Sequence, residues 1–284
     1  MTAPERTAVV LAGGGERVVA WEVGVLAGLA DRGFDVRRAR VLLGTSAGAF
    51  VAARCAVRDP RSAADAIVAR GAVAMEPPSG AAEQFDRLTE LWAGTGGGAA
   101  ARRAVARHAV QWSPGGEAAF VARVTAGLAG AAWPAAVRVV ATDTVTGDRV
   151  VLGAASGVPL ATAVAASRSV PLRCPPVAIA GRANVDGALG SATNADLLLR
   201  DVKDGEVGHV LVVAPAGHAT GLERLWGAAL DAEVAAVADA GAAVSVVRAG
   251  HSDLAAMGPD PMSGAMATLA VAAGRAAGAH ATLR

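Results

Sequence analysis

The sequence predicts an α/β protein with three layers, in which a mainly parallel sheet lies between two layers of helices. Short apolar runs rich in valine alternate along the chain with longer, alanine-rich segments of helical spacing. Parallel strands need a crossover between them, and a helix usually supplies it. The chain has 284 residues, which is ample for one large core. We therefore expect a single domain over residues 1–284.

The first third of the chain sets the pattern of strand, turn and helix. Thr7–Leu11 is a β-branched apolar run that ends in glycines, as a buried strand does. Ala20–Arg32 carries Trp21, Val25 and Leu29 on one stripe, with Gly33 after it as a helix cap. A second strand is expected over Val41–Leu43, followed by a helix over Gly48–Val57 that ends before Asp59-Pro60.

The rest of the chain continues this alternation. Strands are expected over Ala136–Ala141, Arg149–Leu152, Pro175–Ile179, Val207–Val213 and Ala243–Val247. Helices are expected over Val158–Arg168, Asn194–Asp201, Gly221–Ala240 and Met262–Ala279.

A helical insertion is expected around residues 75–130. Glycine- and proline-rich breakers separate alanine-rich helical pieces over Ala82–Trp92, Ala99–Ala109 and Glu117–Gly130. A triple glycine between helices could serve a mobile lid, and an ordinary surface loop is the alternative.

Composition excludes some classes of function. The net charge of +1 gives no overall attraction to nucleic acid or to an anionic membrane. The two cysteines, Cys55 and Cys174, have no metal-type spacing, and the polar N-terminal residues show no signal-peptide pattern. The apolar stretch Val124–Val137 is too short to span a bilayer. We expect a reduced, cytoplasmic protein without metal or cofactor, and peripheral membrane contact stays open.

The candidate nucleophile is Ser46, in Gly44-Thr45-Ser46-Ala47-Gly48. A G-x-S-x-G turn between a strand and a helix projects the serine hydroxyl above the helix N-terminus, where free N–H groups can hold an oxyanion. The alternative is a structural turn with an incidental serine. The motif follows a single strand-helix unit, whereas the α/β-hydrolase motif normally follows several strands.

A glycine cluster, Gly13-Gly14-Gly15, joins the first strand to its helix. A dinucleotide fingerprint needs a glycine where Val18 stands, and no Gly-Lys-Ser/Thr follows for a Walker loop. The N–H groups of such a loop can instead form a concave anion site beside Ser46. Arg17 could order this loop, face the site or form an ordinary salt bridge.

The serine also needs a base. The five histidines carry no motif, and His218, in a loop after a strand, is the best placed of them. Asp186 is the stronger candidate, because it lies at the end of an apolar strand, where a partly dehydrated pocket raises its basicity. Asp186-Gly187 alone would usually mean a turn.

Together these pieces resemble the patatin-like phospholipase family. That family has a G-G-G-x-R/K-G oxyanion loop, a G-x-S-x-G elbow and a D-G-G/A motif, which match Gly13–Val18, Gly44–Gly48 and Asp186–Ala188 in the same order. Further similar stretches are Ala141–Gly147, Ala166–Pro171 with Pro175-Pro176-Val177, and Asn194-Ala195-Asp196, so that the resemblance runs from about Ala8 to Leu199.

The resemblance implies a serine acyl hydrolase that cleaves lipid-like esters. Asp186 would take the proton of Ser46, an acyl-enzyme would form, and an oxyanion hole would be drawn from Gly13, Gly14, Gly15 and Ala47. Two departures from the family pattern are Val18, in place of the last loop glycine, and Ala188, a tolerated variant.

Two other functions stay open. An acyltransferase of related fold usually has a histidine beside the serine, where this chain has Thr45. A non-catalytic lipid-binding or regulatory protein could keep the fold, although the intact serine and aspartate argue against it.

Overall fold

The computed structural model describes residues 4–70, 87, 90–95, 97–113, 115–128, 130–215, 221–260 and 262–284. Its described strands form one sheet in the order β5-β6-β3-β2-β1-β7-β8, and β4 pairs with β3 off this path. The strands are β1 (Thr7–Leu11), β2 (Val41–Thr45), β3 (Val137–Asp143), β4 (Arg149–Leu152), β5 (Val177–Ile179), β6 (Arg182–Asp186), β7 (His209–Ala214) and β8 (Ala243–Arg248).

The centre of the sheet is parallel and one side of it is not. β1 pairs in parallel with β2 and β7, β2 with β3, and β7 with β8. β4, β5 and β6 join as antiparallel strands around β3. The mainly parallel sheet that the sequence predicts is therefore confirmed.

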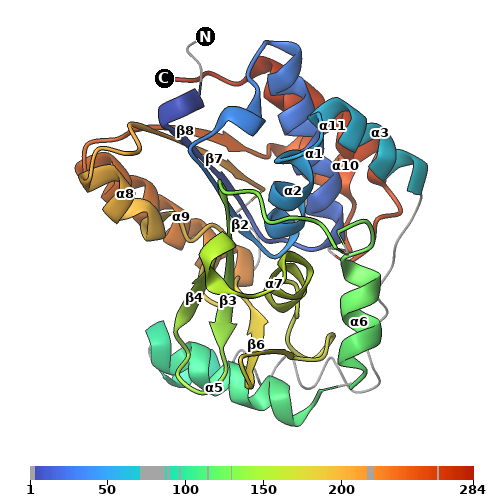
Figure 1. Cartoon of the computed structure of the whole chain (residues 1–284), viewed down its shortest axis with the longest axis vertical. Coiled ribbons are helices and arrows are strands. Elements are labelled where there is room, and N and C mark those ends of the chain that lie inside the picture. The colour runs from blue at the N-terminus through green and yellow to red at the C-terminus, as the bar shows by residue number, and fades with distance from the viewer. Residues whose placement is uncertain are drawn as a thin grey trace.

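Helices cover both faces of the sheet (Figure 1). One layer contains α1 (Glu16–Asp31), α2 (Ala47–Cys55), α3 (Pro60–Arg70), α7 (Leu160–Ser167), α10 (His251–Met257) and α11 (Ala267–His280). The other contains α8 (Leu199–Lys203) and α9 (Gly221–Asp239). α5 (Gly98–Gln111) and α6 (Glu117–Val124) lie near the antiparallel strands. This is the expected three-layer α/β/α arrangement.

The strands are apolar throughout because both faces of the sheet are buried. Along β1, Val9 and Leu11 pack into the core under α1 and α2. Their neighbours Ala8 and Val10 point to the opposite core, under α8 and α9. Side chains alternate between faces along a strand, so a continuous valine-rich run serves two cores at once.

Glycines let α1 and α11 pack backbone to backbone. A Cβ atom built on Gly28 would lie 2.1 Å from the carbonyl oxygen of Arg275, and one on Gly278 would lie 2.1 Å from that of Val25. Gly24 and Gly274 repeat this contact one turn earlier in each helix. The last helix therefore fits against α1 only because these positions lack side chains.

Several predicted boundaries are wrong. α1 begins four residues before the expected Ala20, and α11 begins at Ala267 rather than Met262. The helix expected to end before Asp59-Pro60 does so, as α2, but the sequence does not predict α3, which begins at Pro60: the Asp59 side chain accepts from the N–H of Arg61, and proline suits a first turn. The sequence interpretation also missed α10, which Asp253 caps through the N–H of Gly250.

The predicted insertion around 75–130 is described only in part. Most of the helix expected over Ala82–Trp92 lies outside the described residues, and α5 and α6 account for the two later pieces. The lid therefore stays a prediction. Within the described ranges, no helix has the length and hydropathy needed to cross a bilayer.

Candidate active site

Pairing with β3 brings the two candidate catalytic residues together. Val140 of β3 pairs with Thr45 at the end of β2, and the next residue, Ala141, pairs with Asp186 at the end of β6. β2 runs parallel to β3 and β6 runs antiparallel to it, so their carboxyl ends meet beside the same strand. Ser46, the residue after β2, therefore lies next to Asp186.

The turn at Ser46 depends on its two glycines. Ser46 has a positive φ of 53°, which only a tight surrounding structure maintains in a residue other than glycine. A Cβ atom on Gly48 would lie 2.1 Å from the carbonyl oxygen of Leu11, and one on Gly44 would lie 2.5 Å from the Cα atom of Ala49. Strand and helix can approach this closely only where side chains are absent.

Ser46 and Asp186 are in direct contact. The Ser46 hydroxyl donates to Oδ2 of Asp186 at 2.7 Å, and both residues are 4% exposed. The other carboxylate oxygen, Oδ1, accepts from the N–H of Ala188 at 2.8 Å. Burial raises the pKa of Asp186 to about 6, against the lowering effects of the Ser46 and Ala188 hydrogen bonds and of the Arg168 charge. The site therefore holds a hydroxyl in direct contact with a buried carboxylate of raised pKa.

Gly13 packs against Ser46. A Cβ atom on Gly13 would lie 3.2 Å from that of Ser46 and 3.1 Å from that of Ala188, so a side chain there would crowd the site. The N–H of Gly13 donates to the carbonyl oxygen of Ala192 at 2.8 Å. Gly13, one of the predicted oxyanion-hole residues, therefore lets the loop backbone approach Ser46 closely. Its N–H is already hydrogen-bonded to Ala192.

The other predicted amides are available. No described residue accepts a hydrogen bond from the N–H groups of Gly14, Gly15 or Ala47. Ala47 is the first residue of α2 and Gly15 caps α1, so these N–H groups lie at helix starts, where no partner within the helix exists. Such amides can stabilise a developing negative charge.

Arg17 and Val18 shape the glycine loop in different ways. Arg17 donates to the carbonyl oxygens of Gly258 at 2.8 Å and Pro259 at 3.4 Å, which ties the start of α1 to the end of α10. The loop-ordering role of Arg17 stays a prediction. Val18 is buried, and its Cγ2 would lie 2.5 Å from a Cβ atom on Gly14. The valine thus packs directly against the loop where the resembling family has glycine.

A profile described as patatin-like phospholipase matches residues 9–199, about two thirds of the chain. The chain belongs to the patatin-like phospholipase family. No curated protein sequence matches the chain significantly.

Two solved structures are similar to this patatin-like chain. VipD from Legionella pneumophila is 14% identical with a TM-score of 0.47, over 98% of this chain and 66% of that one. The type III effector protein ExoU is 13% identical with a TM-score of 0.41, over 97% of this chain and 52% of that one. The patatin-like chain thus spans about two thirds and one half of their respective lengths.

Two buried polar residues that motif analysis did not select support the patatin-like site. Ser167 accepts the N–H of Ser46 at 2.7 Å and donates to the carbonyl oxygen of Val140 at 2.6 Å. The Asn194 side-chain amide donates to Oγ1 of Thr45 at 3.1 Å and to the carbonyl oxygen of Gly187 at 3.2 Å. Each therefore fixes backbone beside Ser46 or Asp186.

Two histidines bear on the choice of a candidate base. His209 begins β7, and its Nε2 lies 3.0 Å from the hydroxyl oxygen of Ser245. His218, the other candidate base, lies outside the described residues.

Replacing Ser167 by alanine is expected to lower kcat for ester hydrolysis about tenfold with little change in KM. The Ser46 N–H and the Val140 carbonyl would lose their partner, at about 1–3 kcal/mol. Kinetics on a chromogenic ester, with thermal unfolding alongside, measure both effects. Ser169→Ala is the matched control: that serine is equally buried, and its hydroxyl donates to Pro175 instead. Equal rate losses in the two variants would mean that Ser167 acts through general stability alone.

Proposed function

We propose that this protein is a serine acyl hydrolase that cleaves carboxylic esters of lipid-like substrates through a Ser46–Asp186 dyad and an acyl-enzyme. The observation that carries the proposal is the 2.7 Å hydrogen bond from the Ser46 hydroxyl to the Asp186 carboxylate, between two nearly buried side chains. Family membership supports the lipid-like substrate.

In the first step, Oγ of Ser46 attacks the ester carbonyl carbon while Oδ2 of Asp186 takes the hydroxyl proton. The carbonyl oxygen becomes an oxyanion, which the N–H groups of Gly14, Gly15 and Ala47 are suited to hold. One such donor is typically worth about 10²–10³ in rate. The leaving alcohol departs with the proton from Asp186, and the acyl group stays on Ser46 as an ester.

In the second step, water attacks the acyl-enzyme and Asp186 again accepts a proton. The second tetrahedral oxyanion uses the same amides, and its collapse returns the proton to Oγ of Ser46 and releases the carboxylic acid. A base with a pKa of about 6 is largely ionised at neutral pH and still basic enough to take part, which supports Asp186 in this role.

A fluorophosphonate probe tests the proposal. The folded protein is expected to form one covalent adduct at Ser46, identified by peptide mass spectrometry, because such probes trap activated serines. Ser156→Ala, a change at an exposed serine, should label like the unmodified protein. An adduct at another serine, or none, would contradict the dyad. Chromogenic esters of rising chain length would then define the acyl group.

A further inference from the structure

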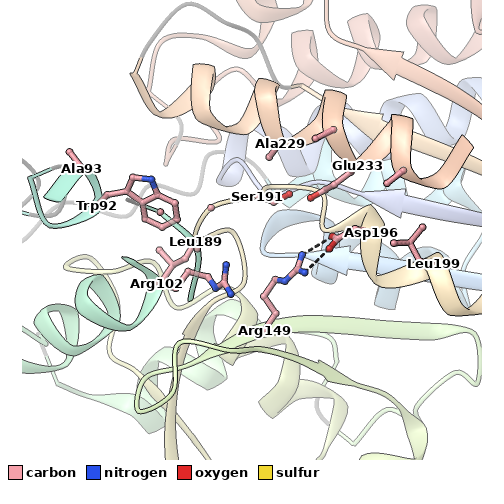
Figure 2. A pocket seen from close by; sticks show the side chains of 15 residues that line it. Trp92, Ala93, Arg102, Arg149, Leu189, Ser191, Asp196, Leu199, Ala229 and Glu233 are labelled. Atoms are coloured by element: carbon pink, nitrogen blue, oxygen red, sulfur yellow. Dashed lines mark hydrogen bonds and ion pairs between the residues drawn. The ribbon is translucent and has the colours of Figure 1, made fainter. Parts of the chain in front are cut away.

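Figure 2 shows a pocket of about 760 Å³ that is distinct from the candidate active site. Neither Ser46 nor Asp186 lines it. The segment Leu189–Ser191, which follows the Asp186 motif, forms one wall. The others come from Trp92 and from residues of α5, β4, α8 and α9. The volume falls in the range of about 300–1,000 Å³ that is usual for small-molecule sites.

The pocket carries one positive charge that no described acidic side chain pairs. Arg149 makes two hydrogen bonds to Asp196, at 2.7 and 2.6 Å, so its charge is neutralised. Arg102 donates from Nε to the carbonyl oxygen of Gly147 at 2.7 Å, and its two terminal nitrogens have no acceptor among the described residues. Figure 2 shows this guanidinium beside Arg149, within the pocket. Partial burial lowers the pKa of Arg102, so an anion bound there would stabilise its charged form.

The remaining walls are mainly apolar. The indole of Trp92 packs over Gly190, where a Cβ atom would lie only 2.7 Å from the ring. Leu189 and Leu199 also line the pocket, and α9 contributes Ala229, Ala232 and Ala236 to it.

The second acidic residue of the pocket is engaged by the chain itself. Oε2 of Glu233 accepts from the Thr193 hydroxyl at 2.6 Å and from the N–H of Ala195 at 2.8 Å. Burial raises the pKa of Glu233, which reduces its negative charge and hence its repulsion of a bound anion.

We propose that this pocket binds a single-chain amphiphile with one negative charge, of the fatty-acid class. The carboxylate would pair with the terminal nitrogens of Arg102, for which a planar, two-oxygen anion is the best geometric match. The acyl chain would lie against Trp92, Leu189 and the alanines of α9. A single unpaired positive charge in the pocket favours a ligand with one negative charge over a ligand with two. This binding function goes beyond the proposed ester hydrolysis and does not depend on it.

Binding of myristate to the Ser46→Ala protein tests the proposal, because that variant keeps catalysis out of the measurement. Titration calorimetry below the micelle concentration is expected to give saturable, one-to-one binding. Arg102→Ala should raise Kd at least tenfold, and Ala229→Phe, which fills the cavity, should raise it by a similar factor. Arg107→Ala, a change to an exposed arginine on the same helix, is the matched control and should bind normally.

Two further ligands separate the contributions of head and chain. Myristyl alcohol lacks the charge, and inorganic phosphate lacks the chain, so both should bind at least tenfold more weakly than myristate. Equal Kd values for Arg102→Ala and Arg107→Ala, or no effect of Ala229→Phe, would overturn the proposal. Phosphate binding as tight as that of myristate would also overturn it. If Arg102→Ala unfolds, Arg102→Lys, which keeps the charge but loses the two-pronged geometry, should show an intermediate Kd.

Discussion

Replacing Ser46 by alanine is expected to abolish ester hydrolysis, with a loss of at least about 10⁴-fold in kcat. The reaction would lose the atom that forms the acyl-enzyme, and removal of a serine nucleophile costs about this much or more in serine hydrolases. The change removes one buried oxygen and leaves the turn glycines in place, so the fold should survive. Hydrolysis of a chromogenic ester, with circular dichroism to confirm folding, measures the effect.

The Ser46→Ala result has a clear control. Ser156→Ala alters an exposed serine and should retain full activity. Residual hydrolysis by Ser46→Ala above one hundredth of the unmodified rate, in protein free of contaminating esterase, would show that another group acts as nucleophile.

Replacing Asp186 by asparagine is expected to have an effect of similar size. Asparagine preserves shape but cannot accept the Ser46 proton, so kcat should fall by at least about 10³-fold. In the unmodified protein Asp186 must be ionised to act as base, and its pKa is about 6. The rate should therefore rise with pH and reach half its plateau near pH 6. A flat profile between pH 5 and 8, or an active Asp186→Asn protein, would exclude Asp186 as the base.

The same substitution should stabilise the fold at alkaline pH. The folded-state pKa of Asp186 is raised from 3.8 to about 6, so the folded chain binds the proton more tightly than the unfolded chain. The free energy of unfolding therefore falls as the pH rises from the unfolded-state pKa of 3.8 to the folded-state pKa of about 6, by an amount on the order of 3 kcal/mol. An uncharged asparagine side chain would avoid that cost. Thermal unfolding should show a higher Tm for Asp186→Asn at pH 8, and the difference should vanish near pH 4.

The sequence could indicate a candidate nucleophile, a candidate base and a glycine loop because each lies in a motif whose residue types have few substitutes. Gly48 must lack a side chain where it meets Leu11, and Ser46 must have a hydroxyl. Ser167 and Asn194 could not be selected in this way. Their contacts with the backbone of Ser46 and Gly187 arise from strand pairing across the sheet, and local spacing does not encode that pairing.

The strands and the layered fold could also be predicted from the sequence, whereas some helix boundaries could not. Valine-rich runs identified the strands, because burial on both faces demands apolar residues throughout. α3 could not be predicted from Asp59-Pro60 alone, because a proline that follows one helix can also begin the next. The early start of α1 was missed because Val18 and Val19 are β-branched, and tertiary packing outweighs their weak helix propensity.

The glycine contact between α1 and α11 has a consequence for the order of folding. It joins segments about 250 residues apart, so closing it costs more chain entropy than any local contact. During synthesis, α1 can therefore reach its final packing only after Ala267–His280 has left the ribosome. Because α1 begins directly after Gly13-Gly14-Gly15, the glycine loop gains the support of α11 only after that helix has been synthesised.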